Sequence, residues 1–380
     1  MSRARPNPKI DPALVAKADE VRAEILAEYQ QSHDHPWIIG FSGGKDSTLV
    51  THLAFEVLMS LGPHERTRKV HIVSNDTLVE SPLVVAHIAK VQSEIERAVD
   101  AWHLPVKVVT TRPNDDGTFW VNLIGRGYPP PNRSFRWCTD RMKIQPTSRY
   151  IREQVVASGE AILLIGVRRS ESATRAATVA KYDSDSRLHP HSDLQNCMVF
   201  RPIVELSTDE VWEYLFFNPP AWGGTHEALI KLYLDAGAAE CSTVMSQDDS
   251  ASCGTSNSRF GCWTCTVVEK DKSLAGFVEA GYAEFTPLIE LRDWLASIRD
   301  VPERRMARRR NGKLTITSSG VFIPGPFTLD TRREVLARLL DAQKQIGMPL
   351  IADEEIARIK MIWAEDAIQM AEWTAASTAA

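Results

Sequence analysis

Short apolar runs alternate with helix-length amphipathic segments along the first half of the chain. Four runs rich in β-branched residues predict buried strands: Trp37–Phe41, Val70–Ser74, Val106–Thr110 and Ala161–Val167. Three segments with a helical pattern follow strands or precede a break: Ser81–Ala101, Thr147–Val156 and Thr208–Phe217. This βαβα rhythm predicts an α/β fold, a parallel sheet flanked by helices. In such sheets ligands bind beyond the carboxyl ends of the strands.

The pattern changes after the Pro219-Pro220 pair. We expect one domain over residues 1–218 and a mostly helical C-terminal region over residues 219–380. The amphipathic stretch Thr331–Leu340 is one of the helices expected there.

Composition sets the broad class of protein. With 380 residues, 43% of them apolar and 24% charged, the chain can bury a full core. No run approaches the roughly 20 apolar residues of a membrane span, and Met1–Pro8 lacks the apolar core of a signal peptide. We therefore expect a cytoplasmic protein that does not enter a membrane. The net charge of −5 means that any contact with nucleic acid requires a local basic patch.

The segment Ser42-Gly43-Gly44-Lys45-Asp46-Ser47 directly follows the first predicted strand. A strand that runs through two glycines into a helix N-terminus points several backbone N–H groups at one spot, which suits an anion. A Walker A loop is excluded, because it requires G-x-x-x-x-G-K-[ST] and here Lys45 is followed by Asp46. A simple glycine turn is the alternative.

This segment resembles the S-G-G-x-D-S loop of the PP-loop ATP pyrophosphatases, whose fold is of the adenine nucleotide alpha hydrolase type. The resemblance implies that the loop holds the β,γ-pyrophosphate of ATP while an acceptor oxygen attacks the α-phosphorus. It further implies that Asp46 helps to place Mg²⁺, and that Lys45 and Ser47 bind the departing pyrophosphate. Asp76, after the next strand, lies where this superfamily holds the adenosine, although Asn75-Asp76 is also common turn chemistry.

Two further segments resemble the phosphoadenylylsulfate reductase group of that superfamily. Arg168, Glu171 and Ser172 match a G-x-R-x-x-E-S segment that supplies an arginine and a serine to the nucleotide phosphates. The alternative for Arg168 is a solvated basic turn. Cys138 and Lys143 match a C-x-x-x-x-K-x-x-P segment, which implies that both lie near the nucleotide.

Cys138 is flanked by Arg136, Arg141 and Lys143. These cations favour a thiolate, so we expect a lowered pKa and a thiol that is reactive toward sulfur transfer or oxidation. The alternative is a buried cysteine that acts as a small hydrophobic side chain.

Four of the six cysteines fall within residues 241–265: Cys241, Cys253, Cys262 and Cys265. In a reduced cytosol such clustering indicates metal rather than disulfides, and four thiolates suit either a [4Fe–4S] cluster or Zn²⁺. Spacing alone leaves both metals open, because only one C-x₂-C pair is present. Cys197 stands apart and is predicted to be structural.

These cysteines, with the string Ser258–Val268 around Cys262 and Cys265, resemble the DndC family of DNA phosphorothioation proteins and the related SspD proteins. The resemblance implies an iron–sulfur ATP pyrophosphatase that acts with a cysteine desulfurase and other phosphorothioation subunits on DNA. In this DNA modification, part of restriction-modification defence, sulfur replaces a non-bridging phosphate oxygen. ATP would adenylate the phosphodiester, with Lys45, Asp46, Cys138 and Arg168 as catalytic residues. Sulfur would arrive either as a persulfide on Cys138 or through the cluster.

Contact with DNA requires the basic segment 304–313. Its arginines are suited to grip phosphates without reading sequence: Arg304, Arg305, Arg308, Arg309 and Arg310. A solvated helix end is the alternative.

Other functions remain open. A phosphoadenylylsulfate or adenylylsulfate reductase shares the Cys138 segment, but no cysteine follows Cys265 to serve as its C-terminal catalytic thiol. A tRNA-thiolating PP-loop enzyme combines the same loop with cysteines. The non-enzymatic alternative is a nucleotide-binding subunit that is stabilised by a structural metal and does not catalyse a reaction.

Overall fold

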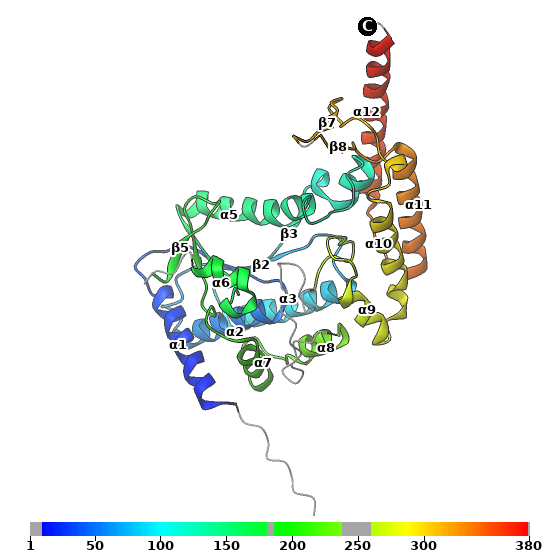
Figure 1. The fold of residues 1–380 in the computed structure, drawn as a ribbon. Helices are drawn as coiled ribbons and strands as arrows, with labels where there is room; N and C mark the ends of the chain where they lie inside the picture. The colour runs from blue at the N-terminus through cyan, green and yellow to red at the C-terminus, as the bar shows by residue number, and fades with distance from the viewer. Residues whose placement is uncertain (1–9, 181–185, 238–259, 319, 379–380) are drawn as a thin grey trace, which may run out of the picture. The chain divides into compact units, whose positions relative to one another are not determined.

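The computed structural model describes residues 10–180, 186–237, 260–318 and 320–378 (Figure 1). The chain forms two compact units, each assembled from separate segments. Unit 1 contains Met1–Asn75, Pro82–Thr111 and Thr147–Phe260, and unit 2 contains Asp76–Ser81, Arg112–Pro146 and Gly261–Ala380. Residues 219–237 thus group with unit 1. A domain boundary near Pro219-Pro220 stays a prediction.

Unit 1 is built on a six-stranded sheet with the order β3-β2-β1-β4-β6-β5. Its strands are β1 (Trp37–Gly40), β2 (Val70–Asn75), β3 (Val106–Thr111), β4 (Ala161–Leu164), β5 (Leu188–Pro190) and β6 (Cys197–Phe200). All neighbouring pairs are parallel except β5 and β6, which are antiparallel. The predicted α/β fold with a mostly parallel sheet is therefore confirmed, and the four predicted strands are β1 to β4.

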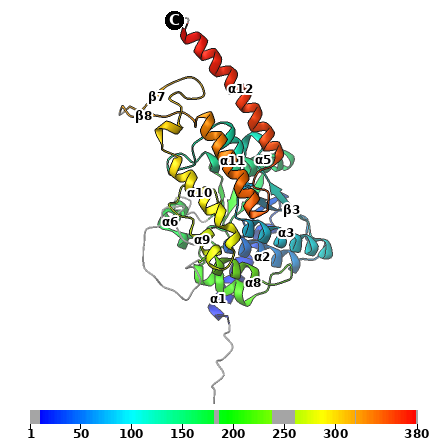
Figure 2. The ribbon, with the colours of Figure 1, turned by 90° about the vertical axis from the view of Figure 1, so that its right-hand side faces the viewer.

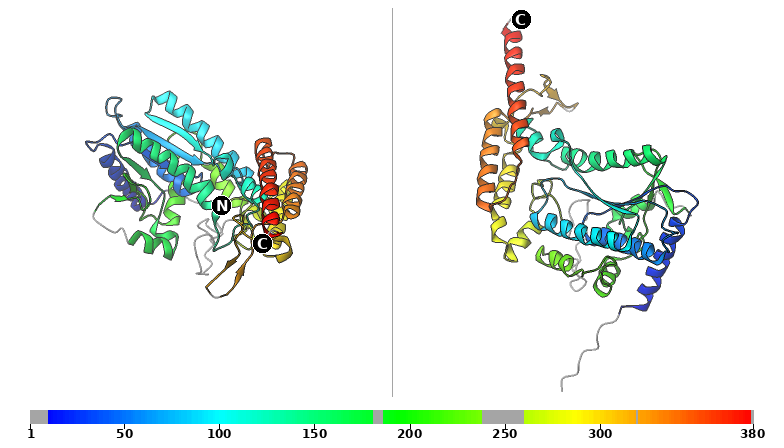
Figure 3. Two further views of the ribbon diagram at one scale, coloured as in Figure 1. Left: turned by 90° about the horizontal axis from the view of Figure 1, so that it is seen from above. Right: turned by 180° about the vertical axis from the view of Figure 1, so that it is seen from behind.

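Helices cover both faces of this sheet (Figure 3). They are α1 (Pro12–Tyr29), α2 (Lys45–Ser60), α3 (Pro82–Trp102), α5 (Gln145–Ser158), α6 (Ala173–Ala180), α7 (Thr208–Phe217) and α8 (Glu227–Asp235). Because side chains alternate along a strand, Trp37 and Ile39 join the core formed with α1, α2, α3, α7 and α8. Ile38 faces the opposite way and packs in a second core with Ile151 of α5. Both faces are buried, which explains why these strands are apolar throughout.

Unit 2 is mostly helical, as expected for the C-terminal region (Figure 2). Its helices are α4 (Trp137–Thr139), α9 (Lys272–Glu279), α10 (Thr286–Ile298), α11 (Leu329–Ile346) and α12 (Asp353–Thr378), and its small hairpin pairs β7 (Thr315–Ile316) with β8 (Phe322–Ile323). The short helix Val121–Gly125 packs against α11 and α12. Arg332 Nη1 of α11 donates to the Gly125 carbonyl at 2.5 Å, and Trp363 Nε1 of α12 donates to the Ile124 carbonyl at 2.9 Å.

Local sequence explains where several helices begin and end. Ser207 and Glu210 form a capping box at the start of α7, and Thr328 caps α11 through the N–H of Thr331. Gly347 ends α11 with a φ of 73°, a left-handed conformation that favours glycine. Among the described helices, none combines the length and the apolar character that crossing a membrane requires.

Candidate functional site

The segment Ser42–Ser47 forms a tight loop between β1 and α2 in unit 1. Gly43 has a φ of 71°, and a Cβ at this position would lie 2.5 Å from a carbon of Ile88, so only glycine fits. Gly44 is the N-cap of α2 and has no side chain that could cap the helix. Since the first turn of a helix carries unpaired N–H groups and partial positive charge, the loop is suited to an anion.

The two serines of the loop bond to each other. Ser42 N–H donates to Ser47 Oγ at 3.2 Å, and the two hydroxyl oxygens lie 3.1 Å apart. Ser47 Oγ also donates to the Gly44 carbonyl at 3.0 Å. These bonds close the loop and hold both hydroxyls at the start of α2.

Arg168 joins the loop from the segment that follows β4. Its Nε donates to Asp46 Oδ1 at 2.6 Å, while Asp46 Oδ2 lies 3.3 Å from Lys45 Nζ. Arg168 is only 1% exposed, and its remaining donors reach Ser170 Oγ at 2.8 Å and Thr208 Oγ1 at 3.1 Å. A solvated basic turn is therefore wrong for Arg168, because the guanidinium is buried and fully directed by its partners.

The chain around Arg168 is fitted to the loop. Glu171 Oε1 accepts the backbone N–H of Arg168 at 2.9 Å. Gly166 approaches the loop closely, since a Cβ on it would lie 2.7 Å from the carbonyl carbon of Asp46. Ser172 follows in the same segment of unit 1. The structure thus brings together Lys45, Asp46, Arg168 and Glu171, while Asp76 and Lys143 belong to unit 2.

Two residues beside the loop were missed by the sequence analysis. Tyr233 of α8 accepts the N–H of Lys45 at 3.2 Å, and its ring centroid lies 5.7 Å from Lys45 Nζ. His87 of α3 is buried against Gly43, and burial lowers its pKa to about 4, so it is neutral near pH 7. Neither residue belongs to a local motif, so no sequence signal could have found them.

In unit 2, Cys262 and Cys265 form the two ends of a tight turn. The N–H of Cys265 donates to the Cys262 carbonyl at 3.0 Å, and Thr77 Oγ1 lies 3.4 Å from Cys262 Sγ. Cys262 also bridges to Glu80, whose carboxylate lies 4.0 Å from Lys143 Nζ. Burial raises the pKa of the Cys262 thiol, against the opposing charge of Lys143.

Cys138 belongs to the same group of thiols. Burial raises its pKa to about 11, and the nearby Cys262 and Cys265 raise it further in the same direction. The expected lowering of this pKa by the flanking cations is therefore wrong. Desolvation of the buried thiol outweighs the charge of the cations that flank it in sequence.

The predicted metal site is described only in part. Cys241 and Cys253 lie outside the described residues. Within the part of the chain that the structure describes, no three His, Cys, Asp or Glu side chains are placed to hold a metal ion. The Cys262–Cys265 turn carries two of the four predicted ligands, and metal binding by these cysteines stays a prediction. Cys197 is 2% exposed in β6, as expected for a structural cysteine.

Asp76 makes the bonds of a turn residue. Its Oδ1 accepts the N–H of Leu78 at 2.9 Å, and its Oδ2 accepts from Arg112 Nε at 3.0 Å. Leu78 has a φ of 65°, which the Asp76 side chain helps to stabilise.

The five arginines of the basic segment differ in their surroundings. Arg304 pairs with Glu334 at 2.6 Å, and Arg305 donates to the Gly325 and Pro324 carbonyls at 2.7 and 3.2 Å. Both therefore stabilise unit 2. Arg308 donates to the Gly312 carbonyl, and Arg309 and Arg310 line a cavity.

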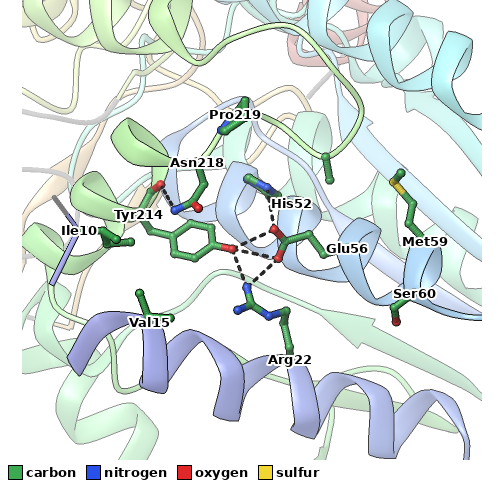
Figure 4. A pocket seen from close by; sticks show the side chains of 11 residues that line it. Ile10, Val15, Arg22, His52, Glu56, Met59, Ser60, Tyr214, Asn218 and Pro219 are labelled. Atoms are coloured by element: carbon green, nitrogen blue, oxygen red, sulfur yellow. Dashed lines mark hydrogen bonds and ion pairs between the residues drawn. The ribbon is translucent and has the colours of Figure 1, made fainter. Parts of the chain in front are cut away.

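Unit 1 contains a separate cavity of about 570 Å³ lined by α1, α2 and α7 (Figure 4). At its base Tyr214 OH donates to Glu56 Oε2 at 2.9 Å, and Arg22 Nη1 donates to both Tyr214 OH and Glu56 at 2.7 and 2.9 Å. His52 Nε2 lies 3.3 Å from Glu56 Oε1 and its Nδ1 lies 3.3 Å from His226 Nε2. The carboxylate is fully occupied by these donors, so the network links helices rather than offering a free ligand-binding group.

Comparison with known proteins identifies the family. The chain is 27% identical over 192 residues to the uncharacterized protein MJ0066 of Methanocaldococcus jannaschii, and 24% identical over 207 residues to MJ0973 of the same organism. These matches cover 50% and 54% of this chain, but only 34% and 42% of the relatives.

Among solved structures, phosphoadenylyl-sulfate reductase from Candida auris has a TM-score of 0.33 and 10% identity, covering 55% of this chain and 88% of that chain. The U34-tRNA thiolase NcsA from Methanococcus maripaludis, with its [4Fe-4S] cluster, has a TM-score of 0.35 and 11% identity, covering 62% and 77%. The Phosphoadenosine phosphosulfate reductase domain profile matches residues 36–268, which include the loop, the Arg168 segment and the thiol pair. The chain therefore belongs to the phosphoadenosine phosphosulfate reductase domain family.

Proposed function

We propose that this chain is an ATP pyrophosphatase that adenylates a DNA phosphodiester, so that sulfur can replace a non-bridging oxygen. The observation that carries the proposal is the glycine-capped start of α2, together with Lys45 and the Arg168–Asp46 pair. This arrangement suits a pyrophosphate group, because backbone N–H groups and cations meet at one loop.

The first step would be nucleotidyl transfer. A non-bridging oxygen of the phosphodiester attacks the α-phosphorus of ATP, and the bond to pyrophosphate breaks. Lys45 and the N-terminus of α2 stabilise the charge that develops on pyrophosphate. Arg168 orients Asp46, whose single carboxylate suits Mg²⁺, a cation that keeps several waters and phosphate oxygens as ligands. When bound, the ion would neutralise phosphate charge.

The second step would be sulfur attack. AMP is a good leaving group on the activated DNA phosphorus, whereas the original oxygen is a poor one. The outer sulfur of a persulfide, for example one on Cys138, would form the new P–S bond, and AMP departs with the oxygen. A thiol reductant would then attack the inner sulfur and break the S–S bond, which leaves the outer sulfur on the DNA phosphorus and forms a mixed disulfide with the carrier cysteine. A second thiol of the reductant restores that cysteine. The close thiols Cys138, Cys262 and Cys265 support sulfur handling in unit 2, with a cysteine desulfurase as the proposed source. A [4Fe–4S] cluster or Zn²⁺ on Cys241, Cys253, Cys262 and Cys265 is part of the proposal.

Mass spectrometry of nuclease-digested DNA tests this function. Cells that lack the gene are complemented with the natural chain, Lys45→Ala, Cys262→Ser or Cys197→Ala. We expect sulfur-containing dinucleotides with the natural chain and with Cys197→Ala, a cysteine outside the thiol group, and their loss with the other two variants. Sulfur found only in tRNA, or no pyrophosphate release from ATP with DNA and partners present, would contradict the proposal.

A further inference from the structure

Unit 2 contains a cavity of about 470 Å³ that the proposed chemistry does not use. Its wall combines two aromatic rings with basic and amide side chains. Prominent lining residues are Tyr128, Phe135, Arg309, Arg310, Asn311 and Pro326.

The aromatic side of the cavity is held in place. The Tyr128 ring meets Trp137 edge-on at a centroid distance of 5.6 Å, and the Arg141 guanidinium lies 5.5 Å from the same ring. Phe135 lies 6.3 Å from Tyr128 and is 39% exposed. Its backbone N–H donates to Asn132 Oδ1 at 2.8 Å, which orders the turn that carries it. A large apolar ring is thus displayed at a fixed position, and such a ring offers a stacking surface.

The polar side of the cavity carries excess positive charge. Arg309 Nε donates to Thr315 Oγ1 at 3.2 Å, and within the described residues no carboxylate pairs with Arg309. Arg310 pairs with Asp366 at 2.6 Å, but Asp366 also pairs with Arg332 at 2.8 Å. One carboxylate therefore serves two guanidinium groups, and the wall favours an anion such as a phosphate.

A ligand that presents a flat aromatic group to one wall of this cavity and an anion to the other wall has the chemistry of a nucleotide. We propose that this cavity holds one unstacked nucleotide of a DNA strand, with its base against Phe135 and Tyr128 and a phosphate beside Arg309. Aromatic stacking combined with guanidinium–phosphate contact is how proteins hold single-stranded nucleic acid. The assignment of DNA rather than another strand rests on the proposed function.

The cavity is connected to the thiols within the same unit. Thr266 Oγ1, next to Cys265, donates to the Pro131 carbonyl at 2.6 Å, and Arg299 Nη1 also reaches this carbonyl at 3.4 Å. These bonds fasten the loop that carries Phe135 to the chain that carries Cys265. Cys138 follows Phe135 by three positions. A nucleotide held here would therefore be presented by the same structural element that carries the thiols.

Photo-crosslinking of the full-length protein tests the site. A short single-stranded oligodeoxynucleotide with one 5-iododeoxyuridine is irradiated with the protein in the absence of ATP, and the modified peptide is sequenced by mass spectrometry. We expect the crosslink at Phe135 or Tyr128. In fluorescence anisotropy, Phe135→Ala and Arg309→Gln should each weaken binding by roughly tenfold or more. The matched controls Phe216→Ala and Arg333→Gln, both exposed in the structure, should change it by less than about twofold.

The outcomes separate this site from the proposed function. The nucleotide site would be overturned by two results together. Crosslinks would form only at other residues, such as those of the β7–β8 hairpin, and the Phe135→Ala variant would bind the oligonucleotide as tightly as the natural chain. Tighter binding of the matched RNA, labelled with 5-iodouridine, would overturn the assignment of DNA. If the crosslink forms at Phe135 but cellular DNA contains no sulfur, the site stands and the proposed function fails.

Discussion

The position of Asp46 depends on the absence of a side chain at Gly166. Gly166 lies so close to the loop that a Cβ would approach the carbonyl carbon and oxygen of Asp46 to 2.7 and 2.8 Å. Real Cβ contacts do not reach such distances with backbone atoms, so any larger residue must displace the loop. Gly166 therefore allows the Arg168 segment to lie directly against the loop, because it has no Cβ.

We predict that Gly166→Ala weakens ATP binding by about tenfold or more, because the added methyl group moves Asp46 away from Arg168 and opens the anion-binding loop. Isothermal titration calorimetry measures the dissociation constant. Gly40→Ala is the matched control, since a Cβ there would meet its nearest neighbours at 3.8 Å, an ordinary contact. Equal affinities of the two variants would show that the close approach of Gly166 does not position the loop.

At the scale of elements, a small polar network joins three helices of unit 1. Glu56 of α2 accepts from Tyr214 of α7 and from Arg22 of α1. Burial by itself would raise the pKa of Glu56, but hydrogen bonds from His52 and Tyr214 and the charge of Arg22 together lower it. The carboxylate therefore stays charged and fully bonded, and this network fixes how α1 and α7 pack on α2.

A double-mutant cycle tests this network. Tyr214→Phe removes the hydroxyl that bonds to Glu56 and Arg22, and should lower the free energy of unfolding by about 1–2 kcal/mol. Glu56→Gln should also destabilise the protein, because Arg22 then loses the charge of its half-buried carboxylate partner. Since both residues share one network, urea unfolding should reveal a coupling energy of at least about 0.5 kcal/mol. Strictly additive effects would mean that the two side chains act independently.

At the scale of the whole molecule, buried histidines couple stability to pH. Burial lowers the pKa of His226 to about 3, with smaller contributions from His52 and His87, and lowers that of His87 to about 4. The unfolded chain takes up protons near the ordinary value of 6.5, whereas these folded histidines stay neutral. Their contribution to stability is therefore complete above pH 6.5 and is lost as the pH falls toward the folded values.

We predict that, for each of these histidines, the free energy of unfolding falls by about 1.4 kcal/mol for every pH unit below 6.5, because the unfolded chain binds a proton that the folded protein does not. Urea unfolding at about pH 7 and about pH 5 measures the change. In His226→Asn the difference between the two pH values should shrink by about 2 kcal/mol. Asparagine is a suitable replacement because His226 is the N-cap of α8.

Replacement of the exposed His64 by asparagine is the control for this experiment, and it should leave the pH dependence unchanged. An unchanged pH dependence in His226→Asn would contradict the assignment of a neutral, buried His226.

Much of unit 1 was predictable because its signals are local. The apolar runs predicted β1 to β4, since strands buried on both faces are continuously hydrophobic. The short strands β5 and β6 were not predicted as strands, because the apolar runs at these positions are shorter than the predicted runs Trp37–Phe41 and Ala161–Val167, which contain β1 and β4. The hairpin β7–β8 was missed for the same reason, with only two residues in each strand.

The roles of individual charged residues were harder to predict. The Arg168 segment was correctly expected beside the loop, but the burial of its guanidinium depends on partners as distant in sequence as Asp46 and Thr208. The shift in the pKa of Cys138 was predicted with the wrong sign, because burial of the thiol outweighs the charge of the cations that flank it in sequence. Arg304 and Arg305 share the basic segment with Arg309, yet their bonds to unit 2 are structural.

Local patterns were enough to predict the α/β class, the glycine loop at the start of α2 and the order of the motifs along the chain. These follow from hydrophobic periodicity and from glycine spacing, which act between near neighbours. Tertiary packing was needed to bring Tyr233 and Gly166 into contact with the loop, to place Cys138 near Cys262 and Cys265, and to form the basic cavity that Phe135 lines. Such contacts join residues far apart in sequence, and burial sets their charge states, so they exist only once the chain has packed.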